Sequence, residues 1–599
     1  VLFMSTPDLN LLVTLDVLLA EGSVAGAARR LQLSPSAMSR ALARLRETTG
    51  DLLLVRAGRT LVPTPRAQEL RERVGQLVQD AQAVLRPVER LNLKQLVRTF
   101  TLRTSDGFVD NFGPPLLNLV RGQAPGVRLR FVQKVDKDSK QLKDAIEAGA
   151  GGEELASIPL DDTYRAAHTL RAEQEMFADM ASADKDPRKS LHVGQVPTPE
   201  LAPDEVVVAV MASAINYNTV WTSVFEPLST FFFLDRFARE GHWESRHRQD
   251  FHVVGSDASG VVVRVGNAVR NWKPGDRVVI APVVTHDQDP DAHEDQMLSA
   301  NQRAWGFETN FGGLADLTVV RASQLLRKPT HLSWEEAAVN LLCAGTSYRM
   351  LVGAHGARMK QGDIVLVWGG TGGIGGYAVQ MVLNGGGIPV AVVSSPERAE
   401  VLRELGCELV IDRKAEGYRF WSDEHTQDES EWRRFGKQIR SLAGSDPDIV
   451  FEHPGRETMG ASVFAAKRGG TVVTCAATSG YSLEYDNRHL WMKLKRIVSS
   501  HFANYQEAWN ANQLVCEGKI QPMLSQVFPL TDLGEAAFQV HKNMHEGKLG
   551  ILCLAPEEGL GIDDPEFREQ VGEDKITLAD LLAELGVIDA ETLFGGEAQ

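Results

Sequence analysis

One carboxylate in this sequence stands in surroundings that do not suit a charge. Glu308 lies in the stretch WGFETNFGG, Trp305 to Gly313, between aromatic residues and beside a glycine pair. An ionised carboxylate is costly to place among apolar groups unless it accepts hydrogen bonds. We therefore expect Glu308 to be hydrogen-bonded. One interpretation is a structural pair between Glu308 and His453, which lies in the stretch FEHPGRETMG.

A second chemical motif is a glycine-rich turn. An apolar strand, Ile364 to Trp368, runs into glycines with the spacing GxGxxG, and a helix and the apolar strand IPVAVV follow. The glycines of this turn are Gly370, Gly372, Gly373 and Gly375. Glycines let the backbone approach a pyrophosphate at the N-terminus of a helix, so this context predicts a Rossmann dinucleotide site. The alternative is a merely flexible turn.

The residues that follow the second strand indicate which dinucleotide binds. NAD-preferring sites usually carry an acidic residue at the end of that strand. Here the strand ends with Ser394 and Ser395, Arg398 is near, and the next strand ends with Arg413 and Lys414. Hydroxyls and cations suit a 2′-phosphate, so the sequence favours NADPH. The alternative is that some of these arginines merely serve the surface.

The strand- and glycine-rich region before this turn contains the string WKPGDRVVI and resembles the catalytic domain of medium-chain dehydrogenase/reductases. Zinc-dependent members of that superfamily need a cysteine in the first loop and a Gly-His-Glu further on. Here the loop reads AINYN, the later motif reads GSDASG, and no cysteine precedes Cys343. One cysteine cannot hold zinc tetrahedrally, so we expect no metal. The remaining chemistry is hydride addition to an activated double bond.

Five long strings identify a narrower resemblance. They are DKDPRKSLHV, NYNTVW, WGFETNFGG, FEHPGRETMG and YDNRHLWMKLKRIVSSHFANY, and they resemble crotonyl-CoA carboxylase/reductases over about residues 141–560. The resemblance implies that NADPH, CO2 and crotonyl-CoA give (2S)-ethylmalonyl-CoA. Hydride would add at the β-carbon, and the enolate would attack CO2 from a site that excludes free water.

The resemblance also implies which residues hold CO2. They are Asn218, Phe307, Glu308 and His453. Asn218 would donate its side-chain amide to one oxygen, and Phe307 would form a wall and offer backbone. Glu308 and His453 would fix an ordered water that donates to CO2.

The stretch RHLWMKLKRI offers cations for the phosphates of coenzyme A. We single out Arg488, Lys495 and Arg496, since arginine and lysine favour phosphate. A solvated helix face is the equally weighted alternative for each of them.

The first 140 residues differ in charge from the rest of the chain. They hold 21 Lys+Arg and 13 Asp+Glu, whereas the remainder holds 42 and 66. A basic head on an acidic body suggests two evolutionary pieces, of which the first can meet a polyanion.

The head has helix-turn-helix character. A helix over Ala25–Leu31 is followed by LSPS, a break with an N-cap and a proline, and a second helix from Pro35 to about Thr48. Its polar face and the following hairpin predict a DNA-contacting set: Ser36, Ser39, Arg40, Arg56 and Arg59. A long helix over Pro65–Arg90 would dimerise.

This head resembles the N-terminal part of LysR-type transcriptional regulators over about residues 8–135. The resemblance rests on SAMSRAL, LLLVRAGRTLVPTPRA and a first strand, helix and second strand of the effector domain, and it stops near Lys140. The ligand-sensing cleft would therefore be incomplete. The equally weighted alternative to weak DNA binding is that the head is a fused remnant without regulated DNA binding.

The whole chain is thus predicted to be an α/β protein, a zinc-free medium-chain dehydrogenase/reductase with a GroES-like β-rich catalytic domain and a Rossmann domain, preceded by a winged helix-turn-helix. We place the domain limits at 1–90 (DNA-binding head and linker helix), 91–140 (truncated effector start), 141–335 (catalytic domain, first part), 336–525 (NADPH domain), 526–560 (catalytic domain, returning part) and 561–599 (acidic tail).

Unpaired cysteines, no signal peptide and no run of 18 apolar residues predict a cytoplasmic protein without a membrane span. The family resemblance suggests a homotetramer. Two other function classes stay open: an NADPH-dependent enoyl-CoA reductase that does not carboxylate, and a DNA-binding regulator with a reductase-like body.

Overall fold

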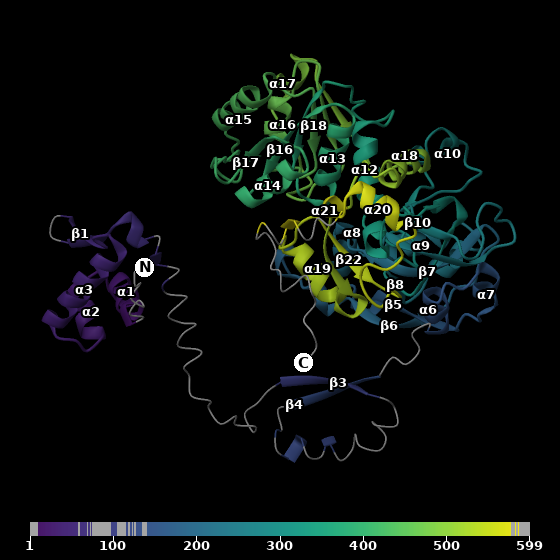
Figure 1. Cartoon of the computed structure of the whole chain (residues 1–599), viewed down its shortest axis with the longest axis horizontal. Coiled ribbons are helices and arrows are strands. Elements are labelled where there is room, and N and C mark those ends of the chain that lie inside the picture. The colour runs from purple at the N-terminus through teal and green to yellow at the C-terminus, as the bar shows by residue number, and fades with distance from the viewer. Residues whose placement is uncertain are drawn as a thin grey trace. The chain divides into compact units, whose positions relative to one another are not determined.

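The chain folds into two compact units, Val1–Lys134 and Val135–Gln599. The computed structural model describes residues 10–57, 60–68, 70, 71, 74, 98–104, 116, 117, 120–122, 124, 127–133, 140–576, 581, 582 and 585. Figure 1 shows the elements of both units along the chain. Every helix in this described part falls short of the length and apolar character that a membrane span requires.

The first unit contains the predicted helix-turn-helix. Three helices precede a hairpin of two antiparallel strands: α1 (Asn10–Glu21), α2 (Val24–Arg30), α3 (Pro35–Thr49), β1 (Leu54–Ala57) and β2 (Thr60–Pro63). The hydroxyl of Ser34 accepts a hydrogen bond from the N–H of Ala37 at 3.2 Å and caps α3 as expected. Met38, Leu42 and Leu45 of α3 are buried against α1 and α2, which leaves the opposite face of α3 for solvent.

The first unit also contains two strands in the segment predicted to be the start of an effector domain, and that assignment stays a prediction. Strands β3 (Arg98–Thr104) and β4 (Val127–Gln133) form where two strands are predicted, and they pair in parallel. Most of the expected dimerisation helix over 65–90 lies outside the described residues.

The catalytic domain of the second unit is built around a strand that is buried on both faces. Strand β7 (Glu205–Ala214) reads EVVVAVMASA, and all of its residues are buried. Its alternate residues enter two different cores, because successive side chains of a strand point to opposite faces. The seven-stranded sheet has the order β14-β10-β9-β7-β22-β21, with β13 also pairing with β7. The other bounds are β9 (Ala258–Val265), β10 (Arg277–Ile280), β13 (Leu317–Arg321), β14 (Leu325–Arg327), β21 (Leu524–Pro529) and β22 (Lys548–Leu552).

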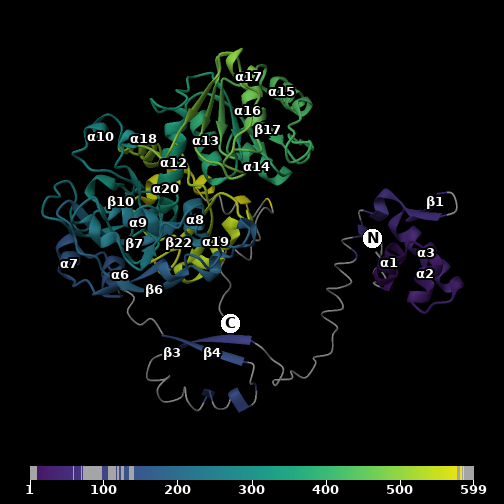
Figure 2. The same ribbon diagram turned by 180° about the vertical axis from the view of Figure 1, so that it is seen from behind.

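The end of the chain completes this sheet. Strand β22 pairs antiparallel with β7, where Gly550 faces Ala214, so residues far apart in the sequence lie side by side. Figures 1 and 2 show the yellow C-terminal elements α19 (Leu533–His541) and β22 within the lobe formed by the blue and teal elements. The return of the chain brings the segment before β22 to the cofactor domain.

The cofactor domain is a doubly wound parallel sheet. Its order is β17-β16-β15-β18-β19-β20, and every pair is parallel. The bounds are β15 (Ile364–Trp368), β16 (Ile388–Val393), β17 (Leu409–Asp412), β18 (Ile449–Glu452), β19 (Thr471–Thr474) and β20 (Arg496–Ser499).

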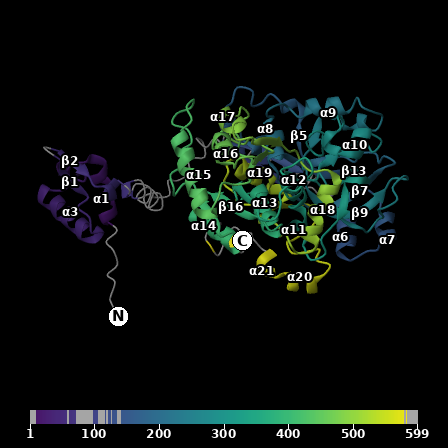
Figure 3. The same cartoon turned by 90° about the horizontal axis from the view of Figure 1, so that it is seen from above.

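Helices cover both faces of this sheet. Ile364, Leu366 and Trp368 of β15 pack into one core, and Val365 and Val367 pack into another. The first core contains α15 (Glu429–Ala443) and α16 (Met459–Ala465). The second contains α12 (Leu341–Leu351), α13 (Gly373–Asn384), α14 (Pro396–Glu404) and α18 (Tyr505–Cys516). Figure 3 shows α15 and α18 on opposite sides of this domain.

The C-terminal tail, predicted only to be acidic, contacts the body over its described part. Helix α20 (Pro565–Val571) places Arg568, which is 8% exposed, in a double hydrogen bond with the Glu336 carboxylate at 2.7 and 2.9 Å. Ile576 and Leu582 enter the same core as α12 and α18. The described part of the tail is therefore packed on the body, because it carries a buried arginine and apolar residues among its acidic ones.

Candidate active site

The glycine turn forms as predicted, at the carboxyl end of β15. A side chain on Gly375 would place its Cβ 2.1 Å from the carbonyl oxygen of Gly369, so only glycine lets α13 approach the turn this closely. The turn presents the N-terminus of α13, where backbone N–H groups favour phosphate. The four predicted glycines lie in this turn (Gly370 and the N-cap Gly372) and in the first turn of α13 (Gly373 and Gly375).

A cavity of 750 Å³ lies beside the ends of β16 and β17. The guanidinium of Arg398 donates to the Ser394 hydroxyl at 2.5 Å. The Ser395 hydroxyl accepts from the backbone N–H of Arg398 at 3.3 Å and caps α14, so part of its hydrogen bonding is structural. The cavity is lined by Ser394, Ser395, Glu397, Arg398, Arg413, Lys414, Gly417, Tyr418, Arg419, Asn543 and Glu546. The predicted cofactor residues of this end of the site are thus brought together.

Both predicted arginines of this cavity have carboxylate partners. Arg413 pairs with Glu457, and Arg398 pairs with Glu546, which is 9% exposed in this pair. Burial raises the pKa of Glu546, and the charge of Arg398 opposes that rise. Sequence reasoning missed Glu546, because it stands just before β22 and only the returning chain brings it here.

Asn218 lies in the first turn of α8 (Tyr217–Val224), and its side-chain orientation follows from a chain of hydrogen bonds. The Ser256 hydroxyl donates to the carbonyl of Trp305 at 2.6 Å, which uses its single hydrogen. Ser256 must therefore accept, and it does so from Nδ2 of Asn218 at 2.8 Å. Within the described residues, the buried Oδ1 of Asn218 has no hydrogen-bond partner. One N–H of the amide and this oxygen are left for other groups.

The turn that carries Phe307 and Glu308 is anchored on the segment that carries Ser256. Gly306 has a φ of 70°, and a Cβ there would lie 2.0 Å from the carbonyl oxygen of Gly255. The Glu308 carboxylate accepts from the N–H of Ala304 at 2.8 Å, which confirms that it is hydrogen-bonded. Burial raises the pKa of Glu308, and this hydrogen bond opposes the rise.

His453 follows β18 and lies beside the glycine turn. Its Nε2 is 2.8 Å from the carbonyl oxygen of Trp368, and because a carbonyl only accepts, Nε2 carries the proton. Burial lowers the pKa of His453, so the ring is neutral and Nδ1 is an acceptor. Glu308 and His453 each have a backbone partner of their own, which weakens the interpretation as a structural pair.

The three predicted coenzyme A residues differ in their surroundings. Lys495 is 7% exposed, and its ammonium donates to the carbonyls of Val463 and Phe464 at 2.6 and 2.9 Å. It satisfies the C-terminus of α16, and the prediction that it binds substrate is wrong. Arg488 and Arg496 are exposed, and Arg488 pairs with Asp486 at 2.5 Å. Their role in binding coenzyme A stays a prediction.

The residues at the two loops where zinc enzymes carry ligands do not suit zinc. Asn216 and Asp257 instead surround the ammonium of Lys548, whose Nζ is 3.2 Å from the Asp257 carboxylate and donates to Oδ1 of Asn216. An ammonium among an amide and a carboxylate supplies a cation of its own. The Sγ of Cys343 lies 3.9 Å from Oδ1 of Asn216, and one thiol is too few for the tetrahedral ligand set of zinc.

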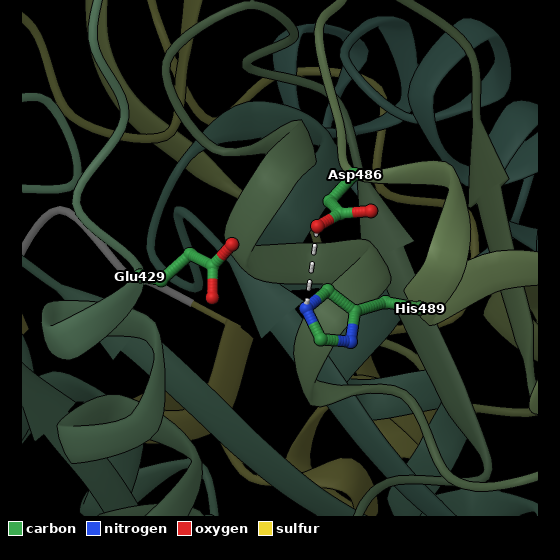
Figure 4. Close-up of side chains that lie close together, drawn as sticks. All are labelled: Glu429, Asp486 and His489. Carbon is green, nitrogen blue, oxygen red and sulfur yellow. Dashed lines mark ion pairs between the residues drawn. The ribbon is translucent and has the colours of Figure 1, made fainter.

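Among the described residues, one group of three metal-ligand side chains lies close together: Glu429, Asp486 and His489 (Figure 4). The guanidinium of Arg488 lies 2.5 Å from Asp486 and 3.6 Å from Glu429, so this group already has a cation. We assign no metal to it.

The predicted DNA-contacting residues are only partly described. Ser36, Ser39 and Arg40 are exposed on α3, whereas the side chain of Arg56 and the whole of Arg59 lie outside the described residues. The exposed face of α3 is consistent with groove binding.

The two-domain body, with its glycine turn, its cation-lined cavity and its ammonium in place of zinc ligands, defines a class: the zinc-free medium-chain dehydrogenase/reductases. Family models agree with the fold. Residues 202–330 match the alcohol dehydrogenase GroES-like domain, 373–515 match the zinc-binding dehydrogenase model, and 9–68 match the bacterial regulatory helix-turn-helix protein, lysR family.

Relatives narrow this class. A crotonyl-CoA reductase of Streptomyces collinus is 56% identical over 434 residues, which are 72% of this chain and 96% of the relative. A crotonyl-CoA carboxylase/reductase of Cereibacter sphaeroides is 38% identical over 403 residues, 65% of this chain and 90% of the relative. The structure of the 2-octenoyl-CoA carboxylase reductase CinF, in complex with NADP and 2-octenoyl-CoA, matches with a TM-score of 0.71 and 55% identity, over 73% of this chain and 98% of that chain.

The chain therefore belongs to the crotonyl-CoA carboxylase/reductase family, and it carries a LysR-type helix-turn-helix before the family body. The predicted fold, the NADP-dependent oxidoreductase class and the cofactor are confirmed.

Proposed function

We propose that this chain reduces crotonyl-CoA with NADPH and carboxylates the product enolate with CO2 held by Asn218, Phe307, Glu308 and His453. Hydride leaves the nicotinamide and adds at the β-carbon of the enoyl thioester. The electron pair of the double bond moves to the α-carbon and the thioester oxygen, which gives an enolate. Attack of the α-carbon on CO2 forms ethylmalonyl-CoA as its carboxylate, and NADP+ is the second product.

The orientation of the Asn218 amide carries this proposal. Ser256 fixes Nδ2, so a second N–H of the same nitrogen is available to one CO2 oxygen. The buried Oδ1, which has no partner within the described residues, suits the electron-poor carbon of CO2. A small, neutral and weakly polar gas needs such a pair of contacts inside apolar walls. The ring of Phe307, 5.9 Å between centroids from the ring of Phe233, supports an apolar wall here.

The ordered water has two hydrogens, and this number decides whether Glu308 is ionised or protonated when CO2 is bound. Nδ1 of His453 is an acceptor, so a water that binds there uses one hydrogen for the histidine and has one left for CO2. If an ionised Glu308 also accepted from this water, no hydrogen would remain for CO2. A protonated Glu308 instead donates to the water oxygen, and the raised pKa of this buried carboxyl favours that form.

The cofactor end of the site fits NADPH. We assign the pyrophosphate to the glycine turn and the 2′-phosphate to Ser394, Arg398 and Arg413, with Ser395 beside them in the same cavity. We also assign crotonyl-CoA as the enoyl-CoA and a homotetramer as the assembly, on family resemblance. The CinF structure holds the longer 2-octenoyl-CoA, so chain-length preference is a question for measurement.

Product analysis tests the reaction. The purified chain with crotonyl-CoA and NADPH is expected to give ethylmalonyl-CoA when bicarbonate is supplied and butyryl-CoA when CO2 is removed. Asn218→Leu should shift the product toward butyryl-CoA while NADPH oxidation continues, because the enolate still forms and is then protonated by water. If wild type yields butyryl-CoA alone at saturating bicarbonate, the chain is a plain enoyl-CoA reductase. If Asn218→Leu loses both activities in equal proportion, the residue does not hold CO2.

A second function is weak DNA binding by the head. The exposed Ser36, Ser39 and Arg40 on α3, together with the match to the lysR family model, favour it. The excess of acidic residues in the body opposes binding of the whole chain to a polyanion. Retardation of duplex DNA by the full chain at low salt, lost on Arg40→Ala, would support this function.

A further inference from the structure

Lys548 places a positive charge in the interior of the catalytic domain, at the start of β22. Its side chain is 4% exposed, and its ammonium donates to the carbonyl of Ile215 at 3.0 Å, to Oδ1 of Asn216 and to the Asp257 carboxylate at 3.2 Å. Three acceptors satisfy all three hydrogens of the ammonium. No hydrogen is left for a substrate, so Lys548 acts on its neighbours.

The Asp257 carboxylate joins three separate segments. One oxygen accepts from Nδ2 of Asn216 at 2.9 Å and from Lys548, and the other accepts from the N–H of Leu342 at 3.0 Å, at the start of α12. Asp257 has no exposed surface, so its charge depends on these partners. Loss of Lys548 would leave it without its counter-charge.

Two neighbouring hydrogen bonds connect Lys548 and its acceptors to the CO2 site. Asn216 is bonded to Asp257, and Asn218, two residues on, is bonded to Ser256. The two hydrogen bonds therefore join the same pair of segments. A shift of the hydrogen bond between Asn216 and Asp257 moves the backbone that carries Asn218 and changes where the second N–H of the Asn218 amide points.

The opposite side of Lys548 is attached to the glycine turn. The neighbouring Gly547 donates its N–H to the carbonyl of Thr371 at 3.2 Å and forms a bridge with Gly372. A Cβ on Gly373 would lie 3.0 Å from Cδ of Lys548, which leaves no slack between the two. Lys548 thus contacts both the glycine turn of the cofactor site and the segment that carries Asn218.

We propose that Lys548, through Asn216 and Asp257, is a positioning residue for carboxylation that holds the Asn218 amide in register with the cofactor turn. This role rests on the proposed function of Asn218. The enolate lives only until CO2 or a proton reaches it, so a small displacement of the amide changes the partition more than it changes hydride transfer.

The test measures the ratio of ethylmalonyl-CoA to butyryl-CoA and total NADPH oxidation at saturating substrates and fixed dissolved CO2. The KM for NADPH is measured separately, over a range of NADPH concentrations. Lys548→Met should lower the product ratio about tenfold, equivalent to about 1.4 kcal/mol, with a smaller fall in NADPH oxidation. Lys548→Met combined with Asp257→Asn removes both charges, so it should fold where the single variant does not, and it should show the same lowered ratio. Thermal melting of each variant reports folding.

Lys495→Met is the matched control. Lys495 is also a buried lysine bonded to carbonyls, but it caps α16 and lies away from the Asn216 group in the hydrogen-bond network. It should lower the melting temperature and leave the product ratio unchanged. A ratio altered equally in both lysine variants would mean that the effect is general destabilisation, and would overturn the inference.

Asn218→Leu tests the CO2 site independently of the positioning role of Lys548. If it lowers the ratio and the double variant of Lys548 and Asp257 does not, the positioning role is wrong and the CO2 site stands. If Asn218→Leu leaves the ratio unchanged, the CO2 site itself is wrong, and the positioning role is refuted with it.

Discussion

Glu546→Gln should tighten the binding of NADPH. In the wild type, Arg398 is 26% exposed and pairs with the Glu546 carboxylate at the predicted 2′-phosphate site. A 2′-phosphate that binds Arg398 must break or share this pair, and it meets the repulsion of a carboxylate. Glutamine keeps the shape and a hydrogen-bonding group for Thr371, whose hydroxyl donates to the Glu546 carboxylate at 3.3 Å, but it removes the competing charge.

The expected change in the Kd for NADPH follows from the strength of the ion pair between Arg398 and Glu546. A hydrogen bond to a charged group contributes about 1.5–3 kcal/mol, and partial exposure of Arg398 reduces this to about 1–2 kcal/mol. The Kd for NADPH should therefore fall about five- to thirtyfold, whereas that for NADH, which has no 2′-phosphate, should change less than about twofold. Arg398→Ala should raise the Kd for NADPH and not that for NADH. In the Arg398→Ala background, Glu546→Gln should tighten NADPH binding less than it does in the wild type, because only the repulsion between the carboxylate and the 2′-phosphate is left to remove.

Fluorescence titration of both cofactors at fixed ionic strength measures these constants. Glu397→Gln is the control, because Glu397 lines the same cavity and carries the same charge without a pair to Arg398. Equal tightening by Glu397→Gln would show a general charge effect, and weaker NADPH binding by Glu546→Gln would show that the carboxylate orients Arg398. Either result would refute the competition.

Four further outcomes are expected. At fixed dissolved CO2, the ratio of carboxylated to reduced product should fall as pH rises through the raised pKa of Glu308, since the protonated form donates to the ordered water; Glu308→Gln, neutral at every pH, should give a flat profile. Arg568→Ala should lower the free energy of unfolding by about 3–5 kcal/mol in denaturant titrations, because the buried carboxylate of Glu336 loses its cationic partner. A loss below about 1 kcal/mol would show that the tail contributes little to stability. Zinc chelators should leave activity unchanged, and stoichiometric zinc whose removal abolishes activity would contradict this. DNA retardation by the full chain should weaken steeply with salt and on Arg40→Ala; retardation that is insensitive to both would exclude α3 as the contact.

The sequence by itself determined the local features. The glycine turn, the caps and apolar face of α3, and the burial of the apolar strands β7 and β15 depend on residues close together in the chain, so spacing and side-chain type predict them. The four predicted CO2 residues came from long matching strings. The structure adds the direction of the Asn218 amide, which Ser256 and the carbonyl of Trp305 decide.

The tertiary structure alone decided the roles of isolated charges. Lys548 and Asp257 are 291 residues apart, and no local pattern marks them as partners, because a salt bridge leaves no periodic signal in the sequence. Lys495 was predicted to bind the phosphates of coenzyme A, with a solvated helix face as the alternative, yet its ammonium donates to the carbonyls at the end of α16, which need donors. Such roles depend on which distant segments the fold brings together, and a single sequence does not contain that geometry in readable form.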